Sequence, residues 1–229
     1  MDIHDPFSSP DTKDPLDDEW AAKRRVSEAT RKLIETLVTV TTSAEELNEV
    51  ADNIAAQADR LAQSERLYGR VAFERAEDGK YGTMASLGYE LNPLDGRSNP
   101  IAAPITVWMD GDKAYAKANM GWQYEGPPGC VHGGFVAALF DQFLGVGQKL
   151  TGQPGMTGTL TVKYLKPTPI DTDLRMEARV ERVEGRKNYL VGEMWAGDVL
   201  TATSAGVFIS ITPEMYRKLL AAKTNQTAD

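Results

Sequence analysis

The sequence is poor in the residues that build disulfides and zinc sites. It contains one cysteine, Cys130, and two histidines, His4 and His132. A lone cysteine excludes a disulfide within the chain and suits the reducing cytoplasm, where we expect this protein. One cysteine and two histidines are too few for a zinc site, so we expect no metal and no cofactor. Because no third group orients Cys130 and His132, we also expect no cysteine nucleophile.

The sequence also lacks long apolar runs and an excess of positive charge. The apolar run that follows Gly134 has about 15 residues, too few to span a bilayer. The first residues contain neither an apolar signal region nor an Arg-rich amphipathic leader. The 33 acidic and 25 basic residues give a net charge of −8. That charge disfavours nucleic acid and anionic membranes, so we expect neither as a partner.

Length and composition indicate one substantial domain with an appendage. The 229 residues, 41% of them hydrophobic, suffice for one sizeable core. Residues 1–18 are rich in Asp and Pro and are predicted to form a disordered acidic tail. Residues 19–66 are predicted to be a helical extension, and residues 67–229 the main domain.

Two amphipathic helices are predicted in the extension. Their apolar stripes are Ala22, Val26, Ala29, Leu33 and Leu37 in the first, and Leu47, Val50, Ile54 and Leu61 in the second. Ser43 and Glu46 have the spacing of a capping box at the start of the second helix. Each helix has one apolar face, so we expect both to pack on the main domain or on a second copy of the chain. Between Trp20 and Arg66, seven basic residues stand against eight acidic ones, which argues against a DNA-binding module.

The main domain has the pattern of an α+β fold. A short strand is predicted over residues 67–74, followed by a long loop punctuated by Asn-Pro and Asp-Gly pairs. Strands over 105–109 and 114–120 are joined by a hairpin turn, and three or four alternating strands follow a single apolar helix. Pro213 opens a predicted final helix that ends at Lys223. This order predicts an antiparallel sheet wrapped around one central helix.

The chain is organised around residues 126–147. Pro127, Pro128 and Gly129 force a rigid turn, and a helix is predicted from Gly134 onward. Its apolar residues fall on every face, which predicts a helix that protein surrounds on all sides.

Two features of this helix carry chemistry. His132, Gly133 and Gly134 stand at its start, where free backbone N–H groups and the helix dipole favour an anion. Asp141 lies in its apolar middle, where a carboxylate is costly unless it is paired or active. Gly134 and Asp141 are seven residues apart, about 10.5 Å along the axis, too far to act on one carbonyl. A second, antiparallel copy of the helix across a two-fold axis solves this problem, so we expect an active site shared by two chains.

The stretch from His132 to Tyr164 resembles a known family. His-Gly-Gly with Asp141 nine residues after His132, followed by the Thr-x-Thr-Leu-x-Val-x-Tyr pattern of Thr157 to Tyr164, resembles hotdog-fold acyl-CoA thioesterases of the phenylacetic-acid-degradation (PaaI-like) type. The resemblance implies a hotdog fold over residues 100–211, an acyl-CoA substrate, and a dimer or a dimer of dimers. It implies that Asp141 is the general base or nucleophile, that the Gly133 amide binds the oxyanion, and that Thr157 or Thr159 assists.

The sequence departs from this family at one position. Some members carry an Asn six residues before the histidine, where this chain has Gly126, so Glu125 or Tyr124 is expected to take over the holding of water. Further substrate contacts are assigned to Val131, Phe140 and Lys163, and Glu125 is counted among them.

Two other functions remain open at this stage. One is a hotdog dehydratase or hydratase acting on acyl thioesters, but such enzymes pair a catalytic His with an Asp or Glu. His132, the one histidine of the main domain, stands instead where the glycine amides begin. The other is a non-catalytic acyl-CoA sensor that uses the N-terminal helices.

Overall fold

In the computed structural model, residues 13–212, 214 and 215 are described. The chain divides into two compact units, one from Asp14 to Ala102 and one that begins at Ala103. The division falls after Ala102, whereas the sequence analysis placed the start of the main domain at residue 67. The predicted tail up to residue 12 and most of the predicted C-terminal helix lie outside the described residues.

The first unit is helical throughout its regular structure. Its elements are α1 (Asp18–Thr39), α2 (Ala44–Ala62), α3 (Arg70–Arg75), the 3-10 helix η1 (Ala76–Gly79) and α4 (Met84–Leu91). The Ser43 side chain accepts a hydrogen bond from the Glu46 N–H at 3.2 Å, which confirms Ser43 as the N-cap of α2, while the Glu46 carboxylate accepts from the Thr42 hydroxyl. The prediction of a strand over residues 67–74 is wrong, because α3 begins at Arg70. Phe73 of α3 instead packs against the Trp20 ring of α1, with 6.0 Å between ring centroids.

α1 uses an unexpected face to pack within its unit. Arg24 donates to both carboxylate oxygens of the buried Glu90 on α4, with its shortest distance 2.6 Å. The Ser27 hydroxyl donates to the Ser98 carbonyl at 2.7 Å. The predicted apolar stripe lies on another side of α1, where Val26 is 56% exposed and Leu37 is 55% exposed. Every residue of α2 is exposed as well, so within residues 13–212 the α2 stripe is uncovered and the α1 stripe is largely so, with Leu33 partly buried.

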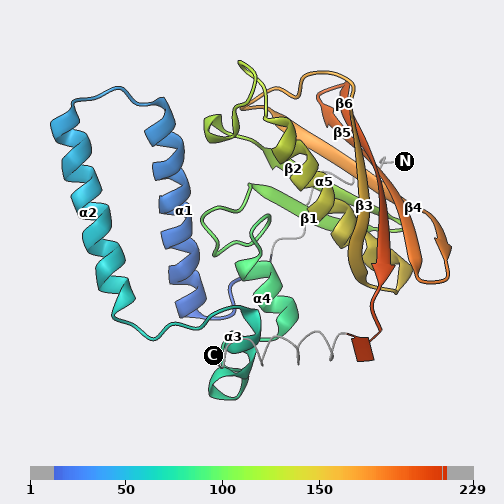
Figure 1. The fold of residues 1–229 in the computed structure, drawn as a ribbon, viewed down its shortest axis with the longest axis horizontal. Coiled ribbons are helices and arrows are strands. Elements are labelled where there is room, and N and C mark those ends of the chain that lie inside the picture. Colours follow the sequence, from blue (N-terminus) through green and yellow to red (C-terminus); the bar gives the residue numbers. More distant parts are fainter. Residues whose placement is uncertain (1–12, 213, 216–229) are drawn as a thin grey trace, which may run out of the picture. The chain divides into compact units, whose positions relative to one another are not determined.

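The second unit contains one antiparallel sheet and one long helix. Its elements are β1 (Ile105–Asp110), β2 (Lys113–Asn119), η2 (Trp122–Tyr124), α5 (Gly133–Gly147), η3 (Gln148–Thr151), β3 (Gly155–Tyr164), β4 (Asp173–Glu184), β5 (Lys187–Ala196) and β6 (Val199–Ser210). The strand order is β1-β2-β4-β5-β6-β3, so β3 lies at an edge. Figure 1 shows α5 lying against one face of the sheet. This is the α+β arrangement that the sequence predicts.

α5 is buried on one side, not on all sides as predicted. Its buried apolar residues face the sheet: Val136, Leu139, Phe140, Phe143 and Leu144. On the other side Gly134 is exposed, and Ala137, Ala138 and Asp141 are partly exposed. The apolar composition that suggested a fully surrounded helix therefore leaves an open stripe in the single chain.

The described part of the chain offers no membrane span. No helix among residues 13–212, 214 and 215 is both long enough and apolar enough to cross a bilayer.

Candidate active site

The loop before α5 is held by its own backbone. The Gly126 N–H donates to the Cys130 carbonyl at 2.9 Å, and the Glu125 carboxylate accepts from the Gly129 N–H at 2.7 Å. A Cβ at position 126 would stand 2.7 Å from the His132 Cα. Close packing therefore explains why this chain has glycine where some family members have asparagine. The Glu125 carboxylate stabilises the loop. No contact in the structure supports its predicted role of holding the attacking water.

His132 caps α5 and fixes which amides are available. Its Nδ1 accepts from the Gly134 N–H at 3.0 Å, and its carbonyl accepts from the N–H groups of Phe135 and Val136. The Gly133 N–H has no hydrogen-bond partner among the described residues. Because Nδ1 accepts, the neutral imidazole carries its proton on Nε2. Gly133, and not Gly134, thus presents the free amide at the positive end of the helix.

Tyr164 completes this end of the site, and the sequence analysis gave it no chemical role. Its hydroxyl donates to the Gly133 carbonyl at 2.8 Å. That carbonyl belongs to the same peptide unit as the Gly134 N–H, so one peptide links Tyr164 to the His132 ring. Tyr164 follows Leu160 and Val162 at every second position of β3, and this alternation indicates that its side chain lies on the sheet face that packs against α5. Nothing in the sequence pairs it with Gly133.

Asp141 and Thr157 form the second half of the site. The Thr157 hydroxyl donates to Asp141 Oδ1 at 2.7 Å, from the edge strand β3 to the open side of α5. No partner of Asp141 Oδ2 is found within residues 13–212, so that oxygen is free to accept a proton or to attack. The structure therefore brings together Asp141 and Thr157, and separately His132, Gly133 and Tyr164.

A β-bulge separates the two candidate threonines. Thr157 pairs with Phe208, whose ring lies toward α5, whereas Thr159 pairs with Val207, the next residue of β6. Consecutive residues of β6 point to opposite faces, so the bulge at Gly158 turns Thr159 away from Asp141. Of the two alternatives, only Thr157 reaches the carboxylate.

Three further assignments need correction or qualification. Phe140 is fully buried in the core, so it is not exposed to a substrate. Lys163 pairs with Thr203, which in turn pairs with Glu193, and therefore lies on the sheet face opposite α5. Val131 is 4% exposed, and its N–H donates to the Thr168 carbonyl at 2.8 Å, which makes it part of the loop's frame.

The two halves of the site are far apart within one chain. Gly133 and Asp141 are separated by eight residues of α5, which is about 12 Å along the helix axis. A single thioester carbonyl cannot meet both groups in one chain, because a catalytic contact needs about 3 Å.

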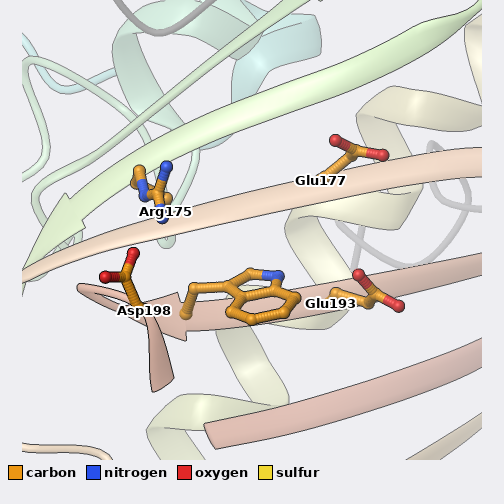
Figure 2. Close-up of a pocket in the computed structure, with 5 residues that line it drawn as sticks. Arg175, Glu177, Glu193 and Asp198 are labelled. Atoms are coloured by element: carbon orange, nitrogen blue, oxygen red, sulfur yellow. The ribbon is translucent and has the colours of Figure 1, made fainter. Parts of the chain in front are cut away.

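A hollow on the other face of the sheet is a separate feature. It has a volume of about 270 Å³ and is lined by Arg175, Glu177, Glu193, Trp195 and Asp198. Figure 2 shows Arg175 and Glu177 on β4, Glu193 on β5 and Asp198 in the turn after β5. Glu177 forms a hydrogen-bonded ion pair with Lys113 at 2.6 Å, which raises the pKa of that lysine. This hollow contains neither a free helix N-terminus nor a paired nucleophile, so it is not the candidate site.

No group of three His, Cys, Asp or Glu side chains that could hold a metal ion occurs in the described part of the chain.

Comparisons with known proteins point to one family for this region. Residues 128–203 match the model of the family described as "Thioesterase superfamily". The chain is 34% identical over 91 residues to a Xenopus laevis protein named acyl-coenzyme A thioesterase THEM4, covering 39% of this chain and 41% of that protein. It is 32% identical over 158 residues to the Bos taurus protein of the same name, covering 68% of this chain and 57% of that protein.

A solved structure resembles both units. The crystal structure of a protein titled a thioesterase superfamily protein matches with a TM-score of 0.68 and 26% sequence identity, and it covers 88% of this chain and 97% of that one. The chain thus spans 41% and 57% of the two curated relatives, but nearly all of the solved structure.

Proposed function

We propose that this protein is an acyl-CoA thioesterase, because residues 128–203 match the thioesterase superfamily model and the second unit has the hotdog fold. It hydrolyses an acyl-CoA thioester to the free acid and CoA. The observation that carries the proposal is the pair of groups on α5: a Gly133 N–H with no partner in the described residues, and an Asp141 carboxylate that Thr157 orients toward an open surface. The relatives named acyl-coenzyme A thioesterases support the choice of substrate.

Each group has a defined task in the reaction. The Gly133 N–H donates to the thioester oxygen as negative charge develops there, with the dipole of α5 behind it. Asp141 either takes a proton from the attacking water or attacks the carbonyl itself to give an anhydride that water then opens. In both routes the C–S bond breaks, and the CoA sulfur leaves as a thiolate that is then protonated. Thr157 holds Oδ1 of Asp141, which leaves Oδ2 for the reaction.

The site is built by two chains in this proposal. The distance of about 12 Å between Gly133 and Asp141 on one helix is bridged if two α5 helices run antiparallel across a two-fold axis. Gly133 of one chain then faces Asp141 of its partner. The open stripe of α5 and the mostly exposed edge strand β3 leave room for such a contact. A homodimer, alone or as half of a tetramer, is therefore the proposed assembly, and the cytoplasmic location stays a prediction.

The experiment that tests the activity is the release of free CoA thiol. Purified full-length protein is incubated with a panel of aliphatic and aromatic acyl-CoA esters, and thiol is measured with a chromogenic disulfide. Catalysed release from at least one ester is expected. If CoA esters bind without turnover, the protein is a sensor. Formation or loss of an enoyl double bond without thiol release would indicate a dehydratase or hydratase. The hydrogen bond that the Gly134 N–H donates to His132 Nδ1 disfavours that function.

Tyr164→Phe is expected to lower kcat by about tenfold while changing KM little. The phenylalanine ring fills the same space but cannot donate to the Gly133 carbonyl, so the Gly133–Gly134 peptide, whose N–H donates to His132, loses the hydrogen bond from Tyr164. A net hydrogen bond contributes about 0.5–1.5 kcal/mol, which corresponds to a factor of up to about ten in rate. Steady-state thioesterase kinetics check this result. Tyr189→Phe on β5, outside the candidate site, is the matched control. Equal kcat in both variants would remove Tyr164 from the catalytic arrangement.

A further inference from the structure

The helical hairpin of α1 and α2 exposes more apolar surface than a stable free helix pair is expected to leave open. The exposed side chains are Val26 and Leu37 of α1, and Leu47, Val50, Ile54 and Leu61 of α2; we call them the hairpin stripe. Those of α2 are between 37% and 58% exposed. Figure 1 shows α1 and α2 as two separate, roughly antiparallel helices. Helices gain most of their stability from packing an apolar face, so a covering partner is required.

The charges beside the α2 part of the hairpin stripe argue against binding to a lipid surface. The polar side of α2 carries Glu45, Glu49, Asp52 and Asp59. Helices that lie on membranes usually carry Lys and Arg on that side, because membrane surfaces are anionic. The partner is therefore a protein surface.

The stripe of α2 is complementary to itself in the antiparallel direction. Leu47 and Leu61 each lie seven residues, or about two turns, from Ile54, so a second α2 running the other way places Leu47 against Leu61 and Ile54 against Ile54. The same pairing brings Glu46 beside Arg60 of the other copy, twice, because these two residues flank one side of the stripe. Arg60 has no ion-pair partner among residues 13–212.

From this symmetry we propose that the hairpin of α1 and α2 is a self-association surface that binds the same hairpin of a second chain. The two-fold axis passes near Ile54, and the interface is isologous, with each contact occurring twice. The other flank of the α2 stripe carries only alanines beside it, Ala51, Ala55, Ala58 and Ala62, which allow a neighbouring helix to approach closely.

The available area agrees with a specific contact. Helices of 22 and 19 residues are about 33 and 28 Å long, and each is about 10 Å wide. The two faces together measure on the order of 600 Å², of which α2 contributes about half, against the roughly 800 Å² that each partner contributes to a standard interface. This contact is separate from α5 and does not depend on the proposed activity.

Chemical cross-linking of the full chain tests the proposal. In a Cys130→Ser background, Ile54→Cys places one thiol near the proposed axis, and any cross-link by a short bis-maleimide must join two chains. The matched control is Asp52→Cys, which lies on the opposite side of α2 because two residues turn a helix by about 200°. We expect covalent dimers with Ile54→Cys and only background amounts with Asp52→Cys. Equal yields, or no cross-link at position 54, would overturn the proposal.

Charge reversal then tests the direction of pairing. In the Ile54→Cys background, Glu46→Arg and Arg60→Glu should each lower the cross-linking rate, by about tenfold, because each turns two attractions into two repulsions. The double variant restores both pairs with reversed sign and should recover the original rate. Recovery cannot arise from misfolding. If the double variant is slower than either single variant, the hairpins do not pair antiparallel as proposed.

Discussion

Replacing Asp141 with asparagine is expected to lower the rate of thioester hydrolysis by at least about 10²-fold, because the site then has neither a base nor a nucleophile. The fold should persist. The amide is nearly isosteric with the carboxylate, and its oxygen can still accept the hydrogen bond that Thr157 donates over 2.7 Å. The loss should therefore appear in kcat, while the thermal unfolding midpoint stays close to that of the wild type.

The control for this substitution is a second Asp→Asn change on the same domain. Asp173 begins β4 and accepts a hydrogen bond from the Asn119 side chain at 3.0 Å, away from α5. Asp173→Asn should keep full activity. Wild-type turnover by a folded Asp141→Asn enzyme would remove Asp141 from the mechanism.

Gly133→Val is expected to lower turnover by about 10² to 10³-fold, the range seen when one oxyanion donor is lost. A Cβ at position 133 would point toward the Tyr164 ring, 3.4 Å from its nearest atom, and not into the space before the N–H. A branched side chain must therefore displace Tyr164, whose hydrogen bond holds the Gly133–Gly134 peptide next to the free Gly133 N–H.

Gly133→Ala provides a graded comparison. A single methyl group fits at ordinary contact distance from Tyr164, so this variant should keep most of its activity. Steady-state kinetics and thermal unfolding of both variants check the expectation. Unchanged kcat in Gly133→Val would show that the oxyanion is bound elsewhere.

Sequence reasoning predicted the parts of the fold that depend on local pattern. Gly111 and Asp112 form the turn between β1 and β2 as predicted, and Gly111 has the positive φ of 60° that such turns need. The apolar run after Gly134 became α5, residues 128–203 match the thioesterase superfamily model, and the predicted hotdog fold is confirmed. These features arise from residues close together in the chain.

The failures involve residues that are far apart in the sequence. The polar face of α1 packs inward because Arg24 forms an ion pair with Glu90, 66 residues away. No local sequence pattern predicts that pair. Thr159 was a reasonable alternative to Thr157 until the bulge at Gly158 reversed its direction. Glycine within a strand is a known sign of a bulge, so that signal was present. No sequence pattern predicted the hydrogen bond that the Tyr164 hydroxyl donates to the Gly133 carbonyl.

The central claim, that Gly133 of one chain works with Asp141 of another, is tested most directly by mixing inactive variants. Gly133→Val and Asp141→Asn chains are combined in equal amounts and allowed to exchange subunits. Half of the dimers are then mixed, and each mixed dimer has one site with both defects and one site with neither, so about a quarter of the wild-type activity should return.

The matched mixture combines wild-type chains with chains that carry both substitutions. On exchange, its activity should fall from about half to about a quarter of the wild-type value, because every site of a mixed dimer then has one defect. If the first mixture stays inactive and the second stays at about half after confirmed exchange, each site lies within one chain and the two-chain account is wrong.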